Sequence, residues 1–243
     1  SAPTACETPL AGLRDGQDCP PRTTTPENPN AMIVVVDYGM GNIGSIVNMV
    51  KKVGGRAEVA TGPDDLRRAD KLILPGVGAF DHGMAGLHRL GYVDVLNERV
   101  LEARTPVLGI CLGIQLFTRR SEEGERPGLG WIEADTVRFR LPEAQPALKV
   151  PHMGWSPIRV VRPHPLFPDP EAERRFYFVH TYHVVCDDPA DVLATASYGI
   201  EFTAAVARGN VFGTQFHPEK SHRFGKALMR HFVEDVPPAG EGP

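Results

Sequence analysis

The chain has 243 residues, of which 42% are hydrophobic and 23% are charged, and its formal net charge at pH 7 is −4. These are ordinary values for a globular protein, and the slight acidity disfavours nucleic acid as the main partner, because nucleic acid requires a basic face. The sequence holds no run of about 18 apolar residues, so we expect no membrane-spanning helix. The four cysteines show no CxxC spacing, which indicates a reducing cytoplasm rather than a disulfide framework.

The two ends of the chain differ in composition from the rest. Residues 1–31 hold six prolines, five threonines and no aromatic residue, and residues 237–243 are rich in proline and glycine. Such segments bury too little apolar surface to offset their chain entropy. We therefore expect a disordered extension over residues 1–31, one folded domain over residues 32–236 and a tail over residues 237–243.

The first half of the folded part alternates between strand and helix patterns. Short apolar runs predict strands, and periodic apolar spacing predicts the helices that follow them. The expected strands are residues 33–36, 56–60, 71–74 and 106–110, and the expected helices are residues 43–53, a segment reaching 96–103, and 112–121. This order implies right-handed crossovers and a parallel sheet that is covered on both faces.

After residue 130 the pattern becomes rich in strands. The expected strand segments are residues 136–141, 158–161, 175–185, 193–197, 204–208 and 211–215, and a last helix is expected at residues 225–233. The predicted fold class is therefore α/β: an open, mostly parallel twisted sheet with helices on both faces and an antiparallel extension.

Residues 107–115 carry the clearest chemical signal. An apolar strand runs directly into a helix with Cys111 at the junction, and Gly109 and Gly113 lie two residues away on either side. This arrangement is typical of a nucleophile elbow, where a tight turn presents the nucleophile at a helix N-terminus that favours a thiolate. The backbone N–H of Leu112 would bind the oxyanion that forms when Cys111 attacks a carbonyl. A buried structural cysteine is the alternative, and the paired glycines disfavour it.

A second apolar strand pattern ends in His217-Pro218-Glu219. Active sites form at the carboxyl edge of parallel sheets, so His217 would lie near Cys111 if the two strands are neighbours. Glu219 would then fix the imidazole tautomer. By itself the tripeptide is more often a surface turn.

The glycines that follow the strand at 71–74 suggest a further part of the site. They allow the backbone N–H of Val77 or Gly78 to turn toward it as a second oxyanion donor. An ordinary tight turn is the alternative.

Two weaker motifs point to other functions. Residues 39–44 match the glycine pattern of a dinucleotide site, but Asp37 and Tyr38 separate the strand from the first glycine. His180 and His183 are three residues apart in a strand pattern, which places them on opposite faces. We therefore expect neither a cofactor nor a metal site.

The segments at 109–113 and 217–219, in this order, resemble the class I (triad) glutamine amidotransferases. The resemblance implies that Cys111, His217 and Glu219 form a triad. It implies attack of Cys111 on the side-chain amide of glutamine, release of ammonia and hydrolysis of a glutamyl thioester. By the same resemblance Gln115 and Glu123 bind the substrate glutamine, and so does the chain at Thr181, Tyr182 and His183.

Five segments resemble more narrowly the glutaminase subunits of imidazole glycerol phosphate synthase, namely residues 37–42, 75–80, 149–155, 177–182 and 217–221. This match covers essentially all of residues 32–235. It implies a heterodimer with a (β/α)₈-barrel synthase (cyclase) subunit, which receives ammonia through its interior. The barrel makes imidazole glycerol phosphate and an aminoimidazole carboxamide ribotide in histidine biosynthesis.

The expected partner interface includes His152, Met153 and Trp155 in an exposed loop, because Trp and Met are common anchors of interface centres. Lys220 is expected there as well. The sequence departs from the resemblance at Ser156, where Asn is usual, at His222, where a small residue is common, and at His183, which is often Tyr.

Three alternatives stay open at this point. The chain could be another triad amidotransferase or a cysteine hydrolase of the same fold. It could be a non-catalytic regulatory scaffold, or, least favoured, a nicotinamide-dependent oxidoreductase. Replacing Cys111 by alanine separates the enzymes that use this thiol from the scaffold, because only the scaffold would keep its function.

Overall fold

The computed structural model describes residues 31–143 and 148–238 of the chain. The extension predicted for residues 1–31 lies, except for Ala31, outside the described residues, and so does the predicted tail beyond Pro238. Within the described part, no helix is long and apolar enough to cross a membrane.

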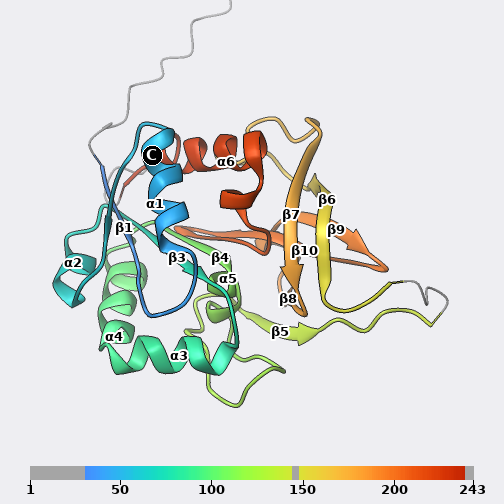
Figure 1. Cartoon of the computed structure of the whole chain (residues 1–243), viewed down its shortest axis with the longest axis horizontal. Helices are drawn as coiled ribbons and strands as arrows, with labels where there is room; N and C mark the ends of the chain where they lie inside the picture. The colour runs from blue at the N-terminus through green and yellow to red at the C-terminus, as the bar shows by residue number, and fades with distance from the viewer. Residues whose placement is uncertain (1–30, 144–147, 239–243) are drawn as a thin grey trace, which may run out of the picture.

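A nine-stranded mixed sheet runs through the molecule (Figure 1). Its first five strands in spatial order are parallel, namely β2 (Arg56–Val59), β1 (Met32–Val35), β3 (Lys71–Gly76), β4 (Val107–Cys111) and β11 (Val211–Thr214). The sheet continues with antiparallel strands β10 (Ile200–Arg208), β9 (Val192–Tyr198), β6 (His152–Val160) and β7 (Arg174–His180). A separate two-stranded sheet pairs β5 (Ala134–Arg138) with β8 (Tyr182–Cys186). The predicted α/β fold class with its antiparallel extension is confirmed.

Helices cover both faces of the parallel part (Figure 1). Helices α1 (Ile43–Lys52) and α6 (His222–Glu234) pack on one face, and α3 (Phe80–Arg89), α4 (Tyr92–Asn97) and α5 (Leu112–Leu116) pack on the other. The remaining helical pieces are α2 (Pro63–Arg67), a π-helical turn at Glu98–Glu102, and 3₁₀ turns at Pro189–Asp191 and Pro218–Lys220. This layering follows from parallel strands, which need crossover helices and are then buried on both sides.

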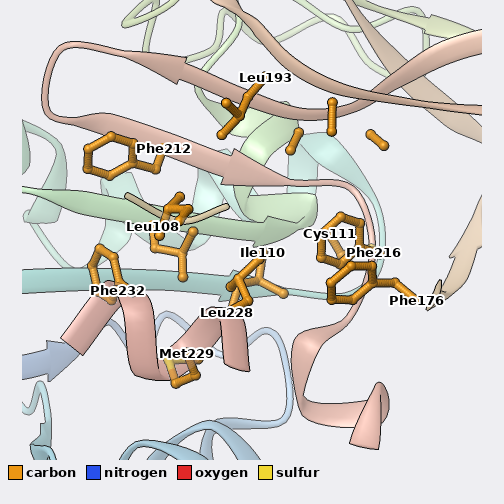
Figure 2. Packing of buried hydrophobic residues seen from close by; sticks show 14 of the residues in the cluster. Leu108, Ile110, Cys111, Phe176, Leu193, Phe212, Phe216, Leu228, Met229 and Phe232 are labelled. Atoms are coloured by element: carbon orange, nitrogen blue, oxygen red, sulfur yellow. The ribbon is translucent and has the colours of Figure 1, made fainter. Parts of the chain in front are cut away.

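The sheet separates two hydrophobic cores. One lies under α1 and α6 and continues into the antiparallel strands, and the other lies under α3, α4 and α5. Figure 2 shows the first: Leu108 and Ile110 of β4 meet Leu228, Met229 and Phe232 of α6. Cys111 lies at the other end of this cluster, with Phe176 and Phe216. The nucleophile candidate is therefore anchored by a packed core.

Three of the differences between the predicted and the observed segments concern the chain around Cys111 and the pocket beside it. The helix expected over 112–121 ends at Leu116. The Thr118 hydroxyl donates to the Gln115 carbonyl, and the backbone N–H of Arg119 leaves the helical pattern and donates to the Ala134 carbonyl. Residues 152–155, expected as a loop, begin strand β6, which pairs with β7 from the His152–His180 register onward. The segment expected over 175–185 is broken at Thr181, where the chain leaves the large sheet for the small one.

Candidate active site

Cys111 occupies a strained turn between β4 and α5. Its φ of +56° and ψ of −102° lie where non-glycine residues are rare. The flanking glycines are sterically required: a Cβ on Gly113 would lie 1.8 Å from the Leu74 carbonyl oxygen, and one on Gly109 would lie 2.5 Å from the Phe117 ring. These features are those of a nucleophile elbow, with the sulfur presented at the start of α5.

Strands β4 and β11 are parallel neighbours, with Gly109 opposite Gly213 and Ile110 opposite Thr214. The chain beyond β11 therefore carries His217 to the same edge of the sheet as Cys111. Nδ1 of His217 lies 2.7 Å from Oε1 of Glu219, and both side chains are almost fully buried. Because a carboxylate accepts, this contact places the proton on Nδ1 and leaves Nε2 free to exchange a proton.

Nε2 of His217 is buried and has no hydrogen-bond partner. Burial by itself lowers the pKa of this imidazole, but the Cys111 side chain and the Glu219 carboxylate outweigh that effect and raise the pKa to about 9. The ring is therefore a strong base toward Cys111, which suits it to receive the thiol proton.

A pocket of about 420 Å³ opens beside Cys111. Seven of the residues predicted for the oxyanion hole and for glutamine binding line it, namely Val77, Gly78, Leu112, Gln115, Glu123, Thr181 and Tyr182. Gly76, the last residue of β3, is the register partner of Cys111, so the chain at Val77 and Gly78 begins directly beside the nucleophile. Gly78 has a φ of +113°, a conformation that glycine adopts without strain.

Glu123 is held at the pocket by the start of α3. Its Oε2 accepts a hydrogen bond of 2.9 Å from the Phe80 N–H, the first N–H group of α3. The N-cap residue of this helix, Ala79, has no side chain that could make such a bond. Asp81 of the same helix accepts from the N–H groups of Glu125 and Arg126, which fixes the loop that carries Glu123. One carboxylate oxygen of Glu123 is thus used for positioning, and the other is available to a ligand.

Gln215 is a site residue that the sequence reasoning missed. Its Oε1 accepts from Nε2 of Gln115 at 3.2 Å, and its own Nε2 lies 3.9 Å from the Cys111 sulfur. Gln115 Nε2 also donates to the Tyr182 carbonyl at 3.2 Å. Gln215 is fully buried directly after β11, two residues before His217, and a buried polar group needs partners, but no local sequence signal shows this burial.

The side chains of two predicted site residues lie away from the pocket surface and the partner surface. His183 is buried and lines a different pocket, with Cys186 and Phe202, so only its backbone, as predicted, remains a candidate for glutamine binding. His152, predicted for the partner interface, is only 1% exposed, because alternate residues of a strand point to opposite faces.

The other predicted interface residues are at the surface. Met153 is 61% and Trp155 40% exposed, and the Trp155 ring stacks on His222 at 5.5 Å. Lys220 is exposed as well, with its ammonium 5.8 Å from the Tyr177 ring centre. Among the described residues there is no group of three or more His, Cys, Asp or Glu side chains that could hold a metal ion.

The comparisons with known proteins agree with this geometry. The family model for class-I glutamine amidotransferases matches residues 34–236. Imidazole glycerol phosphate synthase subunit HisH 2 of Pseudomonas aeruginosa is 55% identical over 205 residues, which are 84% of this chain and all of that relative. The subunit of the same name from Methanococcus maripaludis is 49% identical with the same coverage.

Solved structures share the fold at low identity. The structure of PurLQS from Thermotoga maritima superposes with a TM-score of 0.65 at 18% identity, over 84% of this chain and 98% of that one. A crystal structure of a glutamine amidotransferase gives a TM-score of 0.62 at 21% identity, over 84% and 99% of the two chains.

The nucleophile elbow, the sheet order and the family match together define the class: the chain is a class-I glutamine amidotransferase. Within this class it belongs to the family of HisH subunits, the glutaminase subunits of imidazole glycerol phosphate synthase in histidine biosynthesis.

Proposed function

We propose that Cys111, His217 and Glu219 hydrolyse glutamine to glutamate and ammonia, and that the ammonia passes directly to a (β/α)₈-barrel synthase subunit. The observation that carries the proposal is the buried His217, whose pKa Cys111 and Glu219 raise, together with a pocket of about 420 Å³ that Cys111 itself lines.

The reacting form is the Cys111 thiolate with the proton held on Nε2 of His217, the charged ring that the pKa of about 9 favours at neutral pH. The sulfur then attacks the side-chain carbonyl carbon of glutamine, and the N–H groups of Leu112 and of Val77 or Gly78 stabilise the oxyanion. His217 returns its proton to the nitrogen as the C–N bond breaks, so ammonia leaves and a glutamyl thioester remains. Water, deprotonated by His217, cleaves the thioester, releases glutamate and restores the thiol. Glu219 holds the ring tautomer through both steps.

The pocket supplies groups for the rest of the substrate. The free oxygen of the Glu123 carboxylate binds the α-ammonium of glutamine, and Gln115 with the backbone at Thr181 and Tyr182 forms the wall of the pocket along the substrate. The side chains of Glu123 and Gln115 are held by the hydrogen bonds described above, so little of them has to be ordered when glutamine binds.

The exposed side chains of β6 support the proposed partner surface. Met153 is the register partner of Val179, whose carbonyl lies 3.9 Å from the Cys111 sulfur, so this surface lies one strand away from the site of ammonia release. Ammonia that escapes into water is protonated and loses its nucleophilic lone pair, which favours a tight interface at this point. In the described residues both cysteines, Cys111 and Cys186, are free thiols, which fits a reducing cytoplasm.

The test is glutamate release from glutamine by the chain alone, with the barrel subunit, and with the barrel subunit and its nucleotide ligand. Each assay is run beside Cys111→Ala. We expect activity that appears in the complex, rises with the ligand and is lost in the variant. Strong activity of the chain alone would indicate a free-standing hydrolase, and the absence of any Cys111-dependent activity would refute the proposal.

A further inference from the structure

Two buried histidines outside the triad form a chain of hydrogen bonds beside the pocket. Nδ1 of His180, the last residue of β7, lies 2.8 Å from the Tyr182 carbonyl oxygen. Nε2 of the same ring lies 3.0 Å from Nδ1 of His152, the first residue of β6. Nε2 of His152 lies 2.9 Å from the Ser156 hydroxyl oxygen. The chain thus runs from strand β6 to the start of β8.

The hydrogen bonds of this chain can have only one direction. The Tyr182 carbonyl accepts, so Nδ1 of His180 carries a proton, and in the neutral ring Nε2 is then an acceptor. Nδ1 of His152 must therefore donate to it, which leaves Nε2 of His152 to accept from the Ser156 hydroxyl. Each polar atom of the two rings is satisfied by this single arrangement.

Both rings are held in the neutral form that this direction requires. Burial lowers the pKa of His180 to about 3 and that of His152 to about 4. His152 stacks on Phe178 and on Tyr198, so its ring plane is fixed by packing. In this arrangement a proton added to His180 would direct two N–H groups at each other across 3.0 Å, and one added to His152 would turn its Nε2 from an acceptor into a donor toward the Ser156 hydroxyl.

The chain ends on a carbonyl that the active site shares. Tyr182 O accepts from His180 and also from Gln115, which continues through Gln215 to the Cys111 sulfur. The bond from His180 to Tyr182 spans the residue between them, Thr181, where the strand pattern breaks. His180, Thr181 and Tyr182 all line the pocket.

We infer that His152 and His180 are positioning residues for glutamine: with Ser156 they clamp the corner at Thr181 and so set the shape of the pocket wall beside Cys111. This inference rests on the proposed function, because the wall is taken to bind glutamine. The chain begins on β6, whose exposed Met153 and Trp155 form the proposed partner surface, so it also ties that strand to the substrate site.

Two substitutions of His180 separate the effect of its hydrogen bond to Tyr182 from the effect of its ring volume. His180→Phe keeps an aromatic ring in the core but removes the donor to Tyr182. His180→Asn places an amide N–H near the position of Nδ1 and restores that donor. Loss of one buried hydrogen bond corresponds to about a tenfold weaker affinity. In the complex with the barrel subunit we expect His180→Phe to raise the KM for glutamine by about tenfold at nearly unchanged kcat, and His180→Asn to recover most of this loss.

Two further variants complete the series. His164→Phe is the matched control, because it removes a histidine that packs on Phe212 outside the pocket, and its KM should equal that of the wild type. Ser156→Ala removes only the first donor of the chain from a half-buried position, and it carries the test if His180→Phe does not fold. We expect it to raise KM by about threefold, less than the loss of a full hydrogen bond, because the two rings stay packed.

Covalent labelling of Cys111 distinguishes the inference from the proposed function. Iodoacetamide requires only the thiol, whereas a diazoketone analogue of glutamine must also fit the wall. We expect His180→Phe and Ser156→Ala to react normally with iodoacetamide and more slowly with the analogue. If all variants match the wild type with both reagents and in KM, or if iodoacetamide labelling falls in parallel, the inference is overturned while the function stands. If the analogue does not label wild-type Cys111, both fail.

Discussion

Replacing Gly113 by alanine would test whether the packing of α5 against β3 sets the position of the nucleophile. The Cβ atom would lie 1.8 Å from the Leu74 carbonyl oxygen, where ordinary contact begins at 3.4 Å. The obstacle is backbone in the middle of the sheet, which cannot rotate away. Helix α5 and the turn at Cys111 must therefore shift by about 1.5 Å, because the interior is already close-packed.

The size of the effect follows from that shift. Misplacing a catalytic group by about 1 Å costs on the order of 100-fold in rate, and overpacking a core costs about 1–3 kcal/mol of stability. We expect kcat/KM for glutamine, measured in the complex with the barrel subunit, to fall by about 100-fold or more. The free energy of unfolding from urea titration should fall by about 2 kcal/mol.

Gly62→Ala is the matched control, because a Cβ on Gly62 meets nothing within 4 Å and its φ of −169° suits any residue. Its kcat/KM should be that of the wild type. A Gly113→Ala enzyme that is folded and retains wild-type kcat/KM would show that the elbow adjusts freely, and the argument from packing would be wrong.

Three further predictions concern charge. Burial lowers the pKa of His217, but Cys111 and Glu219 raise it overall from 6.5 to about 9, so the bound proton stabilises the fold fully below pH 6.5 and this contribution is lost as the pH rises through 9. In urea titrations the free energy of unfolding of the wild type relative to His217→Gln should therefore fall by about 3 kcal/mol between about pH 6 and about pH 10. A difference that stays constant with pH would mean that Cys111 and Glu219 do not stabilise the charged His217 ring. Glu123→Gln keeps an oxygen for the Phe80 N–H but loses the negative charge, so the KM for glutamine should rise by about tenfold or more. The free energy of unfolding should stay within about 0.5 kcal/mol of the wild type. An unchanged KM would show that Glu123 does not bind the α-ammonium group. The buried Lys71 donates to the Phe232 and Val233 carbonyls in the last turn of α6. Lys71→Met should lower the free energy of unfolding by about 2 kcal/mol and leave kcat/KM of the folded enzyme unchanged, whereas equal stability would mean that these carbonyls find other partners.

The triad candidates could be found from the sequence because each has a local signal. Glycines flank Cys111 since a Cβ at either position would overlap backbone or a neighbouring ring, and Pro218 fixes the spacing of His217 and Glu219. Gln215 carries no such signal. Its role depends on a hydrogen bond to Gln115, which is one hundred residues away in the sequence. The pairing of β11 with β4 brings the two side chains together.

The end of β6 shows the same limit. Residues 152–155 contain glycine beside exposed Met153 and Trp155, which is a loop pattern when read locally. Pairing with β7 overrides this pattern by supplying backbone partners for each residue and by turning His152 into an aromatic core. The predicted loop therefore became a strand with one exposed and one buried face.

By itself the sequence predicted the alternation of strands and helices in the first half of the domain, the elbow at Cys111 and the candidates for the triad, because short-range sterics and hydrophobic periodicity act over a few residues. Only the tertiary structure decided that His183 lies outside the pocket, that α5 stops after Leu116, and that His152 and His180 meet. Those outcomes depend on which distant strands are neighbours and in what register. Register is fixed by the summed burial of a whole sheet face and not by any segment alone.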